Sequence, residues 1–139
     1  MEGRGRPRKS GPLDGDGRRS LYVEVRRNFL WPMMMTFDRP SPFSSMGRRS
    51  NSNVPAQSLM LMNDPLIVEL ARDWSQRIRE SESGSEARIK LAFEMAFART
   101  PSAAQLERCL AYVGDSDQPD VWFDLCHMLV NMKHFIFVN

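Results

Sequence analysis

Residues 85–113 read SEARIKLAFEMAFARTPSAAQLERCLAYV, and this stretch sets the fold class of the chain. Apolar side chains recur in it at steps of three and four residues, the spacing of one face of an α-helix. Ser102 followed by Gln105 forms a capping box, which marks the start of a second helix. The first stripe comprises Ile89, Ala92, Phe93, Ala96 and Phe97, broadened by Leu91 and Met95, and the second comprises Leu106, Cys109, Leu110 and Val113. We expect the first helix to be central.

Further helices are predicted on both sides of this stretch. Residues 55–62 form a short helix, and Asp64 with Pro65 supplies the cap and first position of a longer one. Gly114 ends the capped helix, and Pro119 begins the last one. The apolar stripe after Pro65 comprises Ile67, Leu70, Ala71, Trp74 and Ile78, and the stripe after Pro119 comprises Trp122, Leu125, Cys126, Leu129 and Val130.

The segment in front of these helices is irregular. Residues 17–65 combine arginine pairs, prolines and methionine-rich runs, a mixture that no ordinary helix or strand needs. Within it, residues 21–26 alternate as a short strand does, and residues 33–37 form an apolar plug after a Trp-Pro break. Residues 1–16 are a basic Gly/Arg/Pro lead-in, which we expect to be flexible. At the other end, the apolar residues 135–138 lack helical spacing and are expected to pack as an extended end.

The prediction is therefore a mainly α chain, with four to five short helices packed behind an irregular Arg/Pro/Met-rich segment and at most one or two short strands. Its 139 residues suffice for one domain, which we place at residues 17–139. No apolar run reaches the roughly 20 residues of a spanning helix, and no export signal is readable, so the localisation is not indicated. Residues 1–50 hold 11 Lys/Arg and 5 Asp/Glu, against 8 and 12 in residues 51–139. The two halves dock on each other, meet different partners or simply present solvated charge.

A basic run at the amino terminus is the sharpest short motif. Residues 3–9 read GRGRPRK and look like an AT-hook, in which Arg4, Arg6 and Arg8 would enter a narrow A·T-rich minor groove. The motif is short and occurs once, and the sequence pI of about 8.8 is modest for a DNA-binding protein. DNA binding is therefore an alternative, and we expect nucleic acid not to be the partner.

The thiols and histidines do not form a readable cofactor site. Haem attachment needs Cys-x-x-Cys-His, but Phe123 stands three residues before Cys126. Cys126, His127 and His134 are a weak metal-ligand pattern, and a packed cysteine beside surface histidines explains them better. Two cysteines are also too few for a disulfide scaffold. We expect no catalytic, cofactor or metal-binding residue from this set, and no cofactor in this chain.

The polar side chains of the irregular segment form a candidate ligand site. Guanidinium groups present a planar fork of donors that suits an anionic or hydroxyl-rich ligand. Ion pairing within the protein is the competing explanation, since a buried arginine needs a partner. The candidate residues are Arg26, Asp38, Arg48, Arg49, Asn53 and Gln57.

The longest motifs of the chain resemble one known family. They are GPLDGDGRRSLY at 11–22, VRRNFL at 25–30, MTFD at 35–38, GRR at 47–49, NVPAQSL at 53–59 and LMNDP at 61–65. Residues 98–102 look like that family's Gly-Arg-x-Pro-Thr helix start, and residues 122–131 look like its closing helix. Over about residues 3–139 the chain resembles the C-terminal domain of planctomycete cytochrome-c-associated proteins, domain of unknown function 1553.

The resemblance implies an accessory domain with no established catalytic residues. Members of the family are usually exported, periplasmic or cell-surface proteins with cytochrome-c-like regions ahead of this domain, so haem would belong to a parent protein. We therefore expect the chain to be a C-terminal piece whose partners are other domains of that parent, with a polysaccharide as a second partner. The molecular function is expected to be non-catalytic, either interaction or structure. The alternative is a hydrolase or polysaccharide-binding domain that uses the polar site.

Overall fold

The computed structural model describes residues 32–38, 47 and 55–136. Within this part the chain forms seven helices and no strand, which confirms a mainly α fold. Two of the helices, α1 and α7, were not expected. The lead-in and the strand predicted at 21–26 lie outside the described residues. The helices are α1 (Pro32–Thr36), α2 (Pro55–Asn63), α3 (Pro65–Ser81), α4 (Ser85–Phe97), α5 (Ala103–Val113), α6 (Pro119–Val130) and α7 (Lys133–Ile136).

The chain divides into two compact units. The first is Met1–Met60 with Asp64–Leu66, and the second is Leu61–Asn63 with Ile67–Asn139. The first unit contains α1 and most of α2, and the second contains nearly all of α3 and the whole of α4 to α7. No helix of the described part is long and apolar enough to cross a membrane.

In the first unit, the predicted apolar plug is a short helix. Pro32 occupies the first helical position of α1, where its missing N–H is not needed, and Thr36 Oγ1 donates to the Pro32 carbonyl oxygen at 2.9 Å. Gln57 on α2 donates from Nε2 to the Thr36 carbonyl oxygen at 3.1 Å, which joins α2 to the end of α1. Met35 is 57% exposed, while Phe37 is only partly so.

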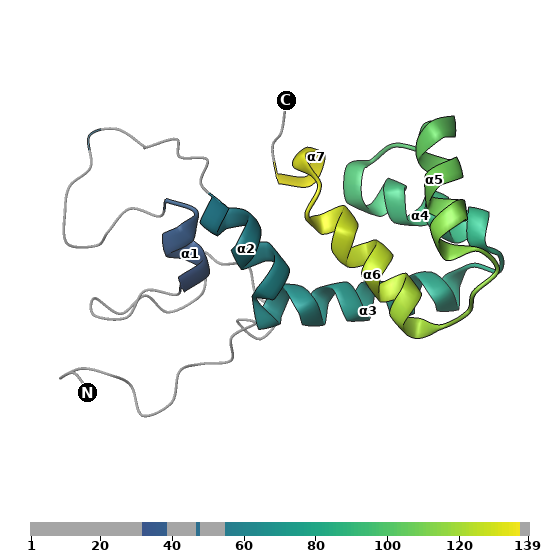
Figure 1. The fold of residues 1–139 in the computed structure, drawn as a ribbon, viewed down its shortest axis with the longest axis horizontal. Helices are drawn as coiled ribbons and strands as arrows, with labels where there is room; N and C mark the ends of the chain where they lie inside the picture. Colours follow the sequence, from purple (N-terminus) through teal and green to yellow (C-terminus); the bar gives the residue numbers. More distant parts are fainter. Residues whose placement is uncertain (1–31, 39–46, 48–54, 137–139) are drawn as a thin grey trace. The chain divides into compact units, whose positions relative to one another are not determined.

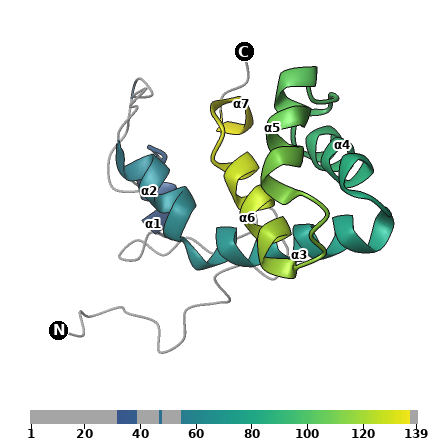
Figure 2. The ribbon, with the colours of Figure 1, turned by 45° about the vertical axis from the view of Figure 1, so that its right-hand side comes forward.

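The second unit holds the apolar core. In both ribbon views α4, α5, α6 and α7 lie on one side of α3 (Figures 1 and 2). Helix α4 contacts α5, α6 and α7, which confirms its central position. Each fully buried large side chain of this core stabilises the fold by roughly 1.5–3 kcal/mol before chain entropy is subtracted. The core cluster comprises Ile78, Ile89, Ala92, Phe93, Cys109, Val113, Trp122, Leu125, Cys126 and Leu129.

The helix boundaries follow the local chemistry of the sequence. Asp64 Oδ1 accepts from the Leu66 amide at 3.0 Å, immediately before the proline that begins α3. Ser102 and Gln105 form both bonds of the capping box at the start of α5. Gly114 ends α5 with φ of 58°, a left-handed value that glycine adopts at no steric cost. These predictions are confirmed.

Two predictions about apolar residues were wrong. Leu70 is 54% exposed, because the buried face of α3 is the narrower set Ile67, Ala71, Ser75 and Ile78. Residues 135–138 were expected to be extended, but Phe135 and Ile136 belong to α7, and residues 137 and 138 lie outside the described part. The amide of Asn131 closes α6 by donating to carbonyl groups of its last turn, and the Phe135 amide donates to the Met132 carbonyl oxygen at 2.9 Å. This tight turn returns the chain to α4 and α6, which α7 contacts without burying any of its own residues fully.

Candidate ligand-binding pocket

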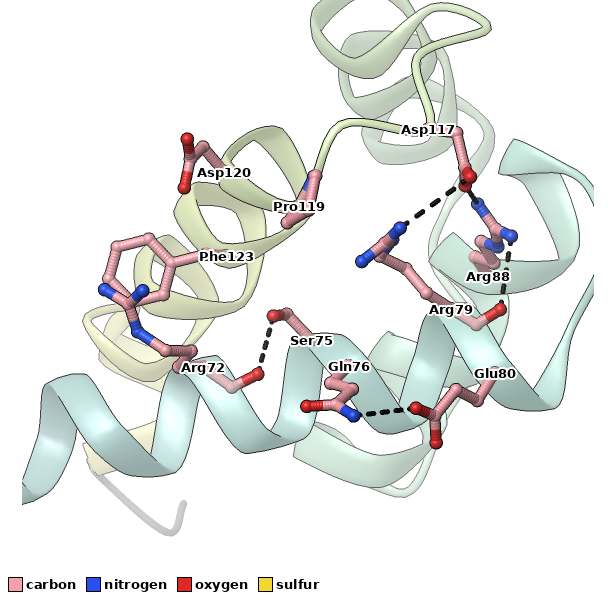
Figure 3. A pocket seen from close by; sticks show the side chains of 10 residues that line it. All are labelled: Arg72, Ser75, Gln76, Arg79, Glu80, Arg88, Asp117, Pro119, Asp120 and Phe123. Atoms are coloured by element: carbon pink, nitrogen blue, oxygen red, sulfur yellow. Dashed lines mark hydrogen bonds and ion pairs between the residues drawn. The ribbon is translucent and has the colours of Figure 1, made fainter.

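A pocket of about 420 Å³ lies within the second unit, between α3 and the start of α6 (Figure 3). Helix α3 supplies one wall, α6 supplies the opposite wall, and α4 and the loop before α6 close one end. Three arginines and three carboxylates are among the lining side chains, together with one aromatic ring. The lining residues are Arg72, Ser75, Gln76, Arg79, Glu80, Arg88, Asp117, Pro119, Asp120 and Phe123.

Arg88 closes the end of the pocket and uses its donors within the protein. Its Nη1 donates to Asp117 Oδ1 at 2.7 Å, and its Nε and Nη2 donate to the carbonyl oxygens of Glu82 and Arg79 at 2.8 and 3.2 Å. Its guanidinium carbon lies over the Trp122 ring, 5.3 Å from the ring centre. The side chain is only 14% exposed. Arg88 therefore joins α3, α4 and the loop before α6.

Asp117 is the acidic partner of this arginine. The hydrogen bond from Arg88 is the main cause that holds the pKa of the Asp117 carboxyl below its ordinary value of 3.8, and the charges of Arg88 and Arg79 act in the same direction. Asp117 itself is 71% exposed, so its pairing takes place at the rim of the pocket rather than in its depth. The carboxylate is ionised and committed to Arg88 at neutral pH.

Arg79 differs from Arg88 in how its donors are used. Its Nη2 lies 3.7 Å from Asp117 Oδ2, an ion-pair distance that is too long for a hydrogen bond. Its Nε is buried and has no hydrogen-bond partner in the structure. The side chain is 24% exposed, and Figure 3 shows its head group projecting into the ring of lining side chains. Arg79 thus presents the end of its guanidinium to the pocket, whereas its Nε is shielded.

The opposite wall of the pocket is an aromatic stack. The Arg72 guanidinium carbon lies over the Phe123 ring, 5.1 Å from its centre. The His127 ring stacks on Phe123 with centres 5.4 Å apart and planes 24° apart. Pro119, one turn earlier on α6, adds apolar surface beside Phe123. The middle of this wall is therefore apolar, and its edge carries the positive charge of Arg72.

Hydrogen-bond acceptors surround the mouth of the pocket. Glu80 accepts from Gln76 Nε2 at 2.7 Å, and Asp120 stands in the first turn of α6. Figure 3 shows Asp120 on the α6 side and the Gln76–Glu80 pair on the α3 side. Ser75 donates its hydroxyl to the Arg72 carbonyl oxygen at 2.7 Å, which leaves the hydroxyl oxygen able to accept. A ligand in this pocket would meet both donors and acceptors.

The site predicted from the sequence is a different one and lies mostly outside the described residues. Of its members only Asp38 and Gln57 are described, and both belong to the first unit. Gln57 is 8% exposed and donates to the carboxyl end of α1, and Asp38 follows α1 with φ of 56°. Arg26, Arg48, Arg49 and Asn53 lie outside the described part, as do Arg4, Arg6 and Arg8, so both sites stay predictions.

The three residues of the weak metal-ligand pattern lie in different surroundings. Cys126 is fully buried, and burial raises the pKa of its thiol to about 12. His127 Nε2 lies 3.2 Å from the Leu61 carbonyl oxygen, whereas His134 packs edge-on against Phe97. Among the residues that the structure describes, no three His, Cys, Asp or Glu side chains are grouped closely enough to hold a metal ion.

Comparison with protein families identifies the chain. Residues 5–113 match the family model described as PSD1, a protein of unknown function (DUF1553). The chain belongs to the DUF1553 family. This confirms the family named by the resemblance, although the DUF1553 match ends at Val113 and so does not include α6. Comparisons with curated proteins and with solved structures gave no match.

Sequence reasoning missed the pocket of this DUF1553 chain altogether. The available signal was on α3, where Arg72, Gln76, Arg79 and Glu80 recur at helical spacing beside the apolar stripe. Ser75, a small polar residue at a buried position of the same helix, was a second sign. Neither sign indicates which residues lie opposite, because α6 begins almost forty residues later in the chain.

Proposed function

We propose that this DUF1553 chain is a non-catalytic binding domain of a larger protein, and that the pocket between α3 and α6 receives a small polar ligand. The observation that carries the proposal is Arg79, a largely buried guanidinium at the pocket whose ion-pair contact with Asp117 Oδ2 is as long as 3.7 Å. Charged groups that are largely removed from water are normally paired closely, so a weakly paired guanidinium beside a pocket is a candidate partner for an anionic ligand.

The size and lining of the pocket support a binding role. Ligand pockets usually span roughly 300–1,000 Å³ and combine an apolar wall with a few well-placed polar groups. The volume of about 420 Å³ is large enough for a compact ligand of one ring or a short chain. Phe123 and Pro119 supply the apolar wall, and the arginines and carboxylates supply the polar groups.

The thiols, the pocket hydroxyl and the His127 imidazole of the second unit suit binding better than nucleophilic catalysis. Burial raises the pKa of both thiols, that of Cys126 to about 12, and a thiol that stays protonated is a poor nucleophile. The hydroxyl of Ser75 donates to a backbone carbonyl group of its own helix rather than to a base. His127 is turned toward the Leu61 carbonyl oxygen and the Phe123 ring.

The parent protein and the wider partners follow from family resemblance. We place the domain behind cytochrome-c-like regions of an exported protein, where it would bind neighbouring domains or present the pocket to a polysaccharide. Fold and family alone do not define such a role, so the pocket is the part of the proposal that rests on geometry.

The proposal is tested by measuring a panel of ligands on the wild-type chain and on a variant whose pocket is blocked. Thermal unfolding is followed with carboxylic acids, inorganic phosphate and sulfate, and neutral sugars, because a ligand that binds only the folded state raises Tm. At least one class is expected to raise Tm of the wild-type chain but not of Gln76→Trp, whose indole would fill the pocket mouth. Arg77→Trp, one residue further along α3 on an exposed position, is the matched control. Equal Tm shifts in wild type and Gln76→Trp, or no shift with any compound, would contradict the proposal.

A further inference from the structure

We infer that the ligand of this pocket is a hydroxy acid, whose carboxylate is held by Arg79 and whose hydroxyl groups are held by the acidic residues at the mouth. The inference rests on the proposed binding function and specifies the chemistry of its ligand.

The carboxylate is assigned to Arg79 because the other anion-binding donors are already used. Arg88 donates to Asp117 and to two carbonyl groups, and its guanidinium packs on Trp122. Arg72 lies over the Phe123 ring at the side of the pocket. Arg79 is left with one contact at 3.7 Å, and Figure 3 shows the two terminal nitrogens of its guanidinium pointing into the pocket. A planar guanidinium in this state matches a carboxylate, to which it donates two parallel hydrogen bonds.

The positions of the lining charges favour a ligand whose negative charge is confined to one group. Arg88 and Asp117 neutralise each other at 2.7 Å. Arg72 and Arg79 then face Glu80 and Asp120, so the remaining lining charges are equal and opposite. A doubly charged phosphate carries charge on all its oxygens and would be repelled by both carboxylates, whereas a hydroxy acid confines its charge to one end. A single carboxylate placed at Arg79, on the side away from Asp120 in Figure 3, meets the positive part of the pocket.

The remaining polar groups indicate hydroxyl groups on the same ligand. Asp120, Glu80 and the Ser75 oxygen are acceptors, and an acceptor is satisfied only by a donor such as a hydroxyl. Phe123 and Pro119 offer an apolar surface for the carbon skeleton that links the carboxylate to these hydroxyls. A sugar acid has this combination of one carboxylate, several hydroxyls and a compact carbon ring.

Calorimetric titration of the full chain with matched probes tests the inference. D-glucuronate is compared with its methyl ester, which keeps the hydroxyls but removes the charge, and with inorganic phosphate. The acid is expected to bind at least about tenfold more tightly than the ester, since a charged hydrogen-bond pair is lost. Arg79→Lys keeps the charge but loses the fork and is expected to weaken binding of the acid about tenfold, whereas Arg77→Lys leaves it unchanged.

The possible failures are distinguishable. If the ester binds as tightly as the acid and Gln76→Trp abolishes both, the pocket is a ligand site but the inference is overturned. Preferential binding of phosphate also overturns the inference and leaves the pocket as a binding site. If none of the probes binds and the wider ligand panel also gives no Tm shift, the proposed function fails together with the inference. Because the comparison of acid and ester uses wild-type protein, it does not depend on how well Arg79→Lys folds.

Discussion

Arg88 and Arg79 sit on neighbouring helices and share the carboxylate of Asp117, yet only Arg88 is fully engaged. Arg88 joins three segments of the second unit through hydrogen bonds and an aromatic contact. At the residue scale, therefore, one arginine of the pocket maintains the fold and the other is available to a ligand.

The structural role of Arg88 predicts a loss of stability on its removal. Arg88→Ala leaves the Glu82 and Arg79 carbonyl oxygens without their donor and uncovers Trp122, so the free energy of unfolding is expected to fall by about 2 kcal/mol. Urea unfolding followed by circular dichroism measures the change. Lys90→Ala, which removes an exposed Lys–Glu pair on the same helix, is the control and should change it by less than about 0.5 kcal/mol. Equal effects of the two substitutions would contradict the role assigned to Arg88.

The lowered pKa of Asp117 predicts how the free energy of unfolding depends on pH. Its pKa is lowered in the folded state, so its contribution is present above the ordinary value of 3.8 and is lost as the pH falls through the lower folded-state pKa. The difference in urea midpoint between wild type and Asp117→Asn should therefore be constant near neutral pH and shrink in strong acid. Ser83→Ala, which replaces an exposed side chain without charge, is the control and should leave the pH dependence unchanged. If the difference in urea midpoint between wild type and Asp117→Asn grew toward low pH, the predicted direction of the pH dependence would be wrong.

At the element scale, the local sequence predicted helix ends better than helix faces. Ser102 and Pro119 act on groups within a few residues of themselves, so their effects are readable from the sequence alone. Leu70 and Phe135 were misjudged because burial depends on which distant element packs beside a helix. The pocket was missed for the same reason: Arg79 and Asp117 come from segments that only the tertiary fold brings together.

The capping box of α5 gives a prediction for one element. Ser102→Ala removes the side-chain oxygen that accepts from the Gln105 amide at 3.3 Å, and is expected to lower the free energy of unfolding by about 1 kcal/mol. Ser83→Ala, in the exposed turn between α3 and α4, is the matched control and should be nearly neutral. Urea unfolding of both variants decides the point, and a neutral Ser102→Ala would mean that the helix end is held by packing alone.

At the scale of the whole molecule, the core cluster belongs entirely to the second unit. We therefore expect a chain that lacks residues 1–54 to keep a single cooperative urea transition, because the cluster of Trp122, Phe93 and their neighbours remains complete. A gradual, non-cooperative loss of helix in that shortened chain would show that the first unit is needed for the core of the second.

The central claim is that the pocket between α3 and α6 is a ligand site built around Arg79. The most direct measurement is the NMR signal of the Arg79 Nε–Hε group, assigned through its loss in Arg79→Lys, during titration of the wild-type chain with D-glucuronate. Because this group belongs to the guanidinium that is proposed to hold the carboxylate, its signal should move in a saturable way, while the Arg77 signal stays in place. An Arg79 signal that does not move up to saturating ligand, or one that moves together with Arg77, would contradict the claim.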